Sequence, residues 1–212
     1  MKAAKRLVIS CVGDSITEGI GACPMGSHSY PAVLQALLGE RYEVKNFGAS
    51  GMTLLREGDY PYVAEPRYAA SLQSAPDVVI LMMGTNDSKP QNWRFKELYS
   101  AQLLALIRQY QQLPTAPCVY VATCATVYRT IDGITDEVVS GDLADRQRQA
   151  AALTGCELID INRATKGHPD WFCDGVHPNN QGYAELAAIF ARILTACYET
   201  GREERDGTKL VL

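Results

Sequence analysis

Short apolar runs alternate along the chain with longer segments in which apolar residues recur at every third or fourth position. The short runs, rich in apolar and β-branched residues, predict buried strands at residues 7–12, 42–46, 78–83, 118–123 and 157–161. The longer segments predict amphipathic helices at residues 30–38, 62–73, 93–113, 136–153 and 181–198. In the last of these helices, Leu186, Phe190 and Ile193 mark a stripe that would face a core.

Strands that alternate with helices predict a parallel sheet with helices packed on both of its faces. We therefore predict the α/β class, as a single three-layer αβα sandwich around a parallel sheet of about five strands. No repeat, low-complexity segment or linker interrupts the series, so residues 1–200 are expected to form one domain. Residues 201–212 mix acidic and basic side chains, which predicts a charged, solvated C-terminal tail.

The charge balance limits the classes of partner. A net charge of −4 argues against nucleic acid and anionic membranes as partners, because both require clustered Lys and Arg. The longest apolar run, residues 78–83, is too short to span a bilayer. No signal-peptide core precedes the first strand, so we expect a cytoplasmic protein, or a secreted or periplasmic one if a leader has been removed.

The cysteines also bear on the class of protein. The chain has 7 cysteines, an odd number, and none of them falls in a Cys-x-x-Cys pair. This usage favours reduced thiols over a disulfide framework or a zinc site. No spacing of His, Cys and carboxylates marks a metal site, and no glycine-rich fingerprint marks a nucleotide site. We therefore expect no metal and no cofactor.

Polar, glycine-containing loops follow several of the predicted strands. Residues 13–19 follow the first strand, residues 46–51 the second and residues 84–87 the third, while residues 173–178 come shortly after the fifth. In a parallel sheet, ligands bind beyond the carboxyl ends of the strands. We expect these four loops to converge on one rim.

Ser15, in the first of these loops, has two interpretations. Ser15 and Glu18 have the spacing of a capping box, in which each side chain binds a free backbone N–H at a helix start. A serine hydroxyl is also a nucleophile when a base takes its proton and a third group orients that base. The local sequence alone favours the cap, so the choice depends on what else reaches the rim.

His177 is the best candidate for that base. Asp174 lies three residues before it, and Gly175 permits the tight turn that would bring the carboxylate to the imidazole. The same segment also suits a simple helix-entry turn capped by Asn179 or Asn180.

Acyl transfer also needs hydrogen-bond donors aimed at the developing oxyanion. The backbone N–H groups of Ser15 and Gly48 and the side-chain amide of Asn86 would supply three donors from three strand ends. Each position taken singly also fits a structural role, with Gly48 in a turn and Asn86 as a cap. Their joint occurrence at separate strand ends favours the oxyanion hole.

The order of these blocks resembles the SGNH hydrolases, also called GDSL-type esterases. The resemblance spans residues 12–178 and is carried by Gly13-Asp14-Ser15, Gly48, Gly84-Thr85-Asn86-Asp87 and Asp174-Gly175-Val176-His177-Pro178. It implies a flavodoxin-like sheet, Ser15 as nucleophile, His177 as base, and Asp174 as the acid that orients it. It also implies an oxyanion hole formed by Ser15, Gly48 and Asn86.

The amino-acid sequence around these blocks is similar to that of bacterial carbohydrate O-acetylesterases and sialate O-acetylesterase-like enzymes. We therefore expect a serine esterase that removes small acyl groups, mainly acetyl, from carbohydrates. A thioesterase or lysophospholipase-like hydrolase, or a non-catalytic binding module on the same fold, is the alternative. The candidate substrate-binding residues are Asp14, Trp93 and Trp171, although the two tryptophans suit half-buried packing equally well.

Overall fold

The five predicted strands form one parallel sheet. The computed structural model describes residues 6–205, and the strands are β1 (Leu7–Gly13), β2 (Tyr42–Gly48), β3 (Val78–Met82), β4 (Cys118–Ala122) and β5 (Glu157–Ile159). Their order is β2-β1-β3-β4-β5, and every neighbouring pair is parallel. This is the flavodoxin-like order, in which the connections reverse direction between β1 and β3.

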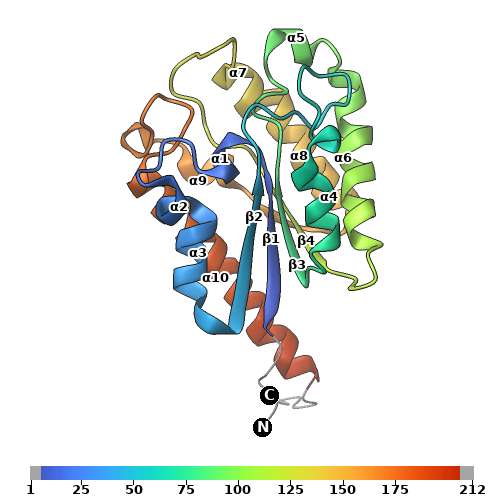
Figure 1. The fold of residues 1–212 in the computed structure, drawn as a ribbon. Helices are drawn as coiled ribbons and strands as arrows, with labels where there is room; N and C mark the ends of the chain where they lie inside the picture. Colours follow the sequence, from blue (N-terminus) through green and yellow to red (C-terminus); the bar gives the residue numbers. More distant parts are fainter. Residues whose placement is uncertain (1–5, 206–212) are drawn as a thin grey trace, which may run out of the picture.

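Helices cover both faces of the sheet, which confirms the three-layer prediction (Figure 1). The helices α3 (Tyr30–Leu38) and α10 (Asn180–Arg205) lie on one face and pack against each other. On the other face lie α4 (Pro66–Gln73), α6 (Lys96–Gln111) and α8 (Ala144–Thr154). Shorter helical segments occupy the connections: α1 (Ser15–Glu18), α2 (Met25–His28), α5 (Pro90–Trp93), α7 (Asp136–Val138) and α9 (Ile161–Thr165), with single turns at Gly39–Arg41, Tyr62–Ala64, Val139–Leu143 and Pro169–Trp171.

Three predicted helices are divided in the structure. The segment 62–73 splits because Pro66 has no N–H and holds Glu65 in an extended conformation, with φ −80° and ψ 133°. The segment 93–113 separates into α5 and α6 at Arg94 and Phe95. The segment 136–153 is interrupted at Gly141, whose φ of −97° and ψ of −113° are not helical.

The core consists of two layers, one on each face of the sheet. In β3, Val79 and Leu81 face the layer that contains α6 and α8, whereas Val78 and Ile80 face the layer of α3 and α10. Both sets are buried, which explains why the strand is continuously apolar in the sequence. Tyr30 and Phe190 join α3 to α10, with their ring centroids 4.8 Å apart.

Helix α10 extends into the predicted tail. It continues through residues 201–205, and residues 206–212 lie outside the described part of the chain. Within residues 6–205, no helix is both long and apolar enough to cross a membrane. The cysteines for which the structure gives a state are free thiols, at Cys11, Cys23, Cys118, Cys124, Cys156 and Cys173.

Candidate active site

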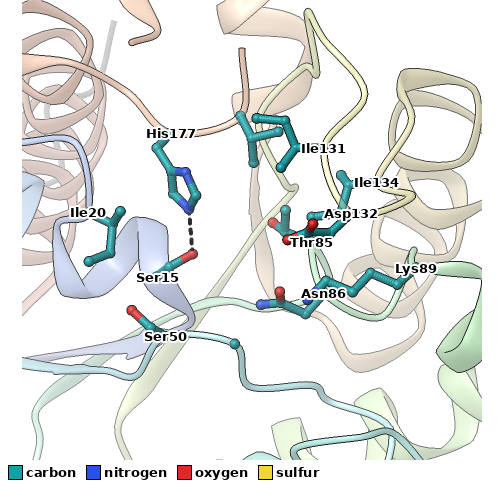
Figure 2. A pocket seen from close by; sticks show the side chains of 12 residues that line it. Ser15, Ile20, Ser50, Thr85, Asn86, Lys89, Ile131, Asp132, Ile134 and His177 are labelled. Carbon is teal, nitrogen blue, oxygen red and sulfur yellow. Dashed lines mark hydrogen bonds between the residues drawn. The ribbon is translucent and has the colours of Figure 1, made fainter. Parts of the chain in front are cut away.

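A cavity of about 320 Å³ opens at the carboxyl end of the sheet, as the loop analysis predicts. It lies beside the point between β1 and β3 where the connections reverse, the usual ligand position in this topology. Loops that follow all the strands contribute to its lining (Figure 2), with Ser15, Ile20, Ser50, Gly51, Thr85, Asn86, Lys89, Ile131, Asp132, Ile134, Val176 and His177.

A chain of hydrogen bonds links Ser15, His177 and Asp174. Ser15 Oγ lies 2.9 Å from His177 Nε2, and Figure 2 shows the two side chains pointing toward each other. On the other side of the ring, His177 Nδ1 lies 2.7 Å from Asp174 Oδ2. Because a carboxylate accepts, Nδ1 carries the proton and Nε2 is free to accept from the serine hydroxyl.

The loop around Asp174 is fixed by the same carboxylate. Asp174 Oδ1 accepts hydrogen bonds from the backbone N–H groups of Val176, at 2.8 Å, and His177, at 2.7 Å. Burial raises the pKa of Asp174, but the hydrogen bonds from His177 and Val176 outweigh it, so the pKa lies below its ordinary value. Asn179 Oδ1 accepts from Gly182 N at 3.0 Å, so a capped helix entry and a positioned His177 occur together.

The helix cap at α1 belongs to Asp14 and not to Ser15. Asp14 Oδ1 accepts from the backbone N–H of Ile16 at 3.0 Å, which leaves the Ser15 hydroxyl available to His177. Asp14 is only 1% exposed and is not among the residues that line the cavity, so this geometry adds no support to the prediction that it binds substrate. Desolvation raises the pKa of this carboxyl, and its Oδ2 is a buried atom without a hydrogen-bond partner among the described residues.

Glu18 also departs from the capping-box prediction. Its carboxylate accepts from Ser50, through both the backbone N–H at 2.9 Å and a short bond from the hydroxyl. It also pairs with Arg67 at 2.7 Å, and Arg67 makes a short hydrogen bond to the carbonyl oxygen of Gly48. Glu18 therefore links α1 to the loop after β2 instead of capping its own helix.

The loop after β2 requires a correction to the predicted oxyanion hole. The N–H of Gly48 donates to Asn46 Oδ1 at 2.8 Å, and Gly48 does not line the cavity. A Cβ at this position would come within 2.1 Å of Glu18 N, so this glycine is required for the close packing of α1 on β2. Gly51 lines the cavity instead, and within residues 6–205 no group accepts a hydrogen bond from its N–H or from that of Ser15.

Asn86 lies where the sequence predicts it, at the end of β3. It is 5% exposed and lines the cavity, and Figure 2 shows its side chain extending toward the space beside Ser15 and Ser50. One N–H of its amide donates to the carbonyl oxygen of Met52 at 3.1 Å. The second N–H remains available, since an amide nitrogen carries two.

The two tryptophans predicted to bind substrate are not among the residues that line the cavity. Trp93 packs edge-on against Tyr99, with ring centroids 5.7 Å apart. Trp171 stacks on His168 at 3.9 Å and packs against the core beside α10. Both tryptophan side chains are half-buried and packed, which is the other role expected for them.

The sequence prediction missed the loop after β4. This loop forms a tight turn in which Ile131 and Ile134 bridge and Asp132 occupies the apex, and all three line the cavity together with Lys89. Its sequence contains Asp132-Gly133, a common turn signal, but no functional motif points to it. Only its position after a strand end would have indicated a role. Among the described residues, no group of His, Cys, Asp and Glu could hold a metal ion.

A second buried carboxylate, Asp87, fixes the loops around the cavity. Its two oxygens accept the backbone N–H groups of Leu54, at 2.9 Å, and Leu55, at 2.7 Å. Asp87 directly follows Asn86, so it ties the end of β3 to the loop after β2. Desolvation raises its pKa to about 7, although these two hydrogen bonds oppose the rise.

The pKa of Asp87 predicts a specific pH dependence of stability. Because the folded-state pKa lies above the unfolded value near 4, this group contributes stability that is full below pH 4 and is lost as pH rises toward 7. In Asp87→Asn, the free energy of unfolding should not show this decline with pH. The slope of the free energy of unfolding against pH should therefore differ from that of the parent by at most about 1.4 kcal/mol per pH unit. Urea unfolding between pH 4 and 8 measures it, with the exposed Asp145→Asn as control. Parallel curves for the parent and Asp87→Asn would contradict this origin.

Comparisons with known proteins identify the family of this chain. A family model described as the GDSL-like Lipase/Acylhydrolase family matches residues 11–185. An acetylxylan esterase from Xylanibacter ruminicola is 32% identical over 201 residues, covering 86% of this chain and 42% of that protein. The chain thus spans about two fifths of the length of this relative.

Solved structures share the fold at low sequence identity. A carbohydrate acetylesterase family member from Sinorhizobium meliloti aligns with a TM-score of 0.69 and 23% identity, over 89% of this chain and 97% of that one. The aryl esterase of M. smegmatis aligns with a TM-score of 0.71 and 20% identity, over 90% and 99%. Because the family match runs from β1 through the loop that carries Asp174 and His177, the chain belongs to the GDSL-like lipase/acylhydrolase family.

Proposed function

We propose that this chain is a metal-independent serine esterase with Ser15 as nucleophile, His177 as general base and Asp174 as the residue that orients His177. The observation that carries the proposal is the continuous hydrogen-bond chain from Ser15 Oγ through both nitrogens of His177 to Asp174 Oδ2. Its members come from opposite ends of the sequence, so a local structural need does not account for their meeting.

The geometry supports a two-step acyl transfer. Ser15 Oγ attacks the ester carbonyl carbon as its proton passes to His177 Nε2, and the protonated imidazole then gives that proton to the leaving alcohol oxygen. The acyl group remains on Ser15. A water molecule next loses a proton to His177 and attacks the acyl-enzyme, and the acid leaves as Ser15 regains its proton. Asp174 stabilises the imidazolium in both steps.

The oxyanion is bound by three donors in this proposal. These are the backbone N–H groups of Ser15 and Gly51 and the free N–H of the Asn86 amide, with Gly51 replacing Gly48. All three residues line the cavity beside the Ser15 hydroxyl. Because each donor is already fixed before the reaction, none has to reorganise as charge develops.

The substrate we propose is a small acyl ester, mainly acetyl, on a carbohydrate hydroxyl. The cavity of about 320 Å³ beside Ser15 is at the small end of the range for ligand sites, which favours a small acyl group. The similarity to an acetylxylan esterase supports a sugar as the alcohol.

Replacement of the nucleophile is the direct test of the mechanism. Ser15→Ala should reduce kcat for p-nitrophenyl acetate by about 10⁴-fold or more, since loss of a serine nucleophile leaves only binding and oxyanion stabilisation. The exposed Ser27→Ala serves as the matched control and should retain the parental rate. If Ser15→Ala retains the parental rate as well, Ser15 is not the nucleophile.

Asn86 provides a separate test of the oxyanion hole. Asn86→Ala should lower kcat by about 100- to 1000-fold, the usual cost of one oxyanion donor, with little change in KM. Asn86→Asp should lose more, because it places a negative charge where the oxyanion forms. The melting temperature of each variant checks that the fold is retained, and an unchanged kcat in folded Asn86→Ala would remove this residue from the site.

A substrate panel tests the acyl and alcohol preferences. We expect kcat/KM to fall from acetyl to octanoyl p-nitrophenyl esters and to favour acetylated xylo-oligosaccharides over acyl-coenzyme A thioesters. A preference for long chains or thioesters would instead establish the thioesterase or lysophospholipase-like alternative. Turnover of no ester at all, by folded protein, would favour the non-catalytic binding module.

A further inference from the structure

Lys89 and Asp132 line the cavity, yet the proposed mechanism uses neither of them. Figure 2 shows both on the side of the cavity away from Ile20, across from the Ser15 and His177 pair. Among the described residues, no group forms an ion pair or a hydrogen bond with the ammonium of Lys89 or the carboxylate of Asp132. Both charged groups are therefore available to a ligand.

Two acidic side chains near the cavity, by contrast, are paired within the protein. Glu18 is paired with Arg67, at 2.7 Å. Asp174 is held by the His177 ring, at 2.7 Å. Lys89 and Asp132 therefore differ from these pairs, because each lacks a partner within residues 6–205. The side of the cavity that they line is called the Lys89–Asp132 wall below.

The loops that carry the two residues are in contact. The turn that presents Asp132 is closed by a hydrogen bond from Ile134 N to the carbonyl oxygen of Ile131, at 2.8 Å. Gly133, at φ +80°, rests on the ring of Pro90, and a Cβ there would come within 2.5 Å of Pro90 Cδ. Because Pro90 directly follows Lys89, this contact seats the loop after β4 on the loop after β3.

The chemistry of this wall suits a polyhydroxyl ligand. The ammonium of Lys89 offers only donors and the carboxylate of Asp132 only acceptors, so together they match hydroxyl groups, which both donate and accept. Ile131, half-buried beside Asp132, offers apolar surface for the C–H face of a sugar ring. An anionic ligand would be attracted by Lys89 but repelled by Asp132, so the pair does not favour a phosphate or a carboxylate.

We propose that Lys89 and Asp132 form a subsite that binds free hydroxyl groups of the glycosyl unit whose acetyl group is removed at Ser15. This subsite rests on the proposed function and specifies its alcohol: a sugar with unmodified hydroxyls near the ester. Substrates that carry the same acetyl group on an alcohol without such hydroxyls do not engage this wall.

The subsite is tested by the ratio of kcat/KM for a sugar ester to kcat/KM for an ester without sugar hydroxyls. We expect Asp132→Asn and Lys89→Met each to lower kcat/KM for acetylated xylo-oligosaccharides relative to p-nitrophenyl acetate by about 10- to 100-fold, the range for losing a hydrogen bond to a charged group. The loss should fall mainly on KM, because these contacts exist before and during the reaction. A ratio that stays at the parental value in both variants would overturn the subsite.

Matched controls come from an ion pair on the outer surface. Lys96 and Asp142 form a bridge of 3.4 Å and do not line the cavity, so Lys96→Met and Asp142→Asn carry the same substitutions elsewhere. The ratio should not change in these controls. If Lys89→Met weakens turnover while Asp132→Asn strengthens it, the wall recognises an anion and the polyhydroxyl assignment is wrong.

A binding measurement separates failure of the subsite from failure of the proposed function. Calorimetry with xylotetraose and Ser15→Ala protein reports sugar binding without turnover, and adding Lys89→Met or Asp132→Asn should weaken it about 10-fold or more. If the parent deacetylates no sugar but this difference in binding persists, the function fails and the subsite stands. If the added substitutions leave xylotetraose binding unchanged, or if the sugar does not bind, the subsite fails.

Discussion

Two buried carboxylates at the carboxyl edge of the sheet hold the site in place. Asp14 and Asp87 lie out of contact with water, where desolvation disfavours their charged forms and raises the pKa of each. The cost is offset because their oxygens bind backbone N–H groups that would otherwise be unsatisfied, at Ile16, Leu54 and Leu55. These bonds fix the start of α1, which carries the proposed nucleophile, and the loop after β2, and the geometry of the proposed active site depends on both.

Other side chains make the local hydrogen bonds around Ser15, so its hydroxyl can bond to His177. Asp14 caps α1, which relieves Ser15 of the role that the local sequence suggests for it. Glu18 reaches across to Ser50, next to Gly51, so the helix that carries the proposed nucleophile also holds the loop that lines the proposed oxyanion hole. A displacement of either segment would therefore disturb both the proposed nucleophile and the proposed oxyanion donors.

The sequence predicts this structure best where one physical requirement acts on many residues. Strands such as β3 are buried on both faces, so continuous apolar runs reveal them, and the strand ends then locate Ser15 and Asn86. The choice between Gly48 and Gly51 could not be predicted in this way, because both glycines lie near the same strand end and are distinguished only by tertiary contacts, such as the bond from Gly48 N to Asn46. Trp93 was similarly ambiguous, since a half-buried aromatic side chain suits a ligand rim and a core margin equally well.

Different loops supply the groups for the proposed reaction and the groups for the proposed recognition of the alcohol. In the proposed mechanism, the nucleophile and base come from the end of β1 and from the loop before α10, and the oxyanion donors come from the ends of β1, β2 and β3. The loop after β4 supplies no group to the proposed chemistry, but it presents Asp132 and Ile131 to the cavity and is seated on Pro90. In the proposed subsite, recognition of the alcohol is thereby separated from attack on the ester. Under this proposal, changes in the turn would alter which sugar is bound while leaving the arrangement of Ser15 and His177 intact.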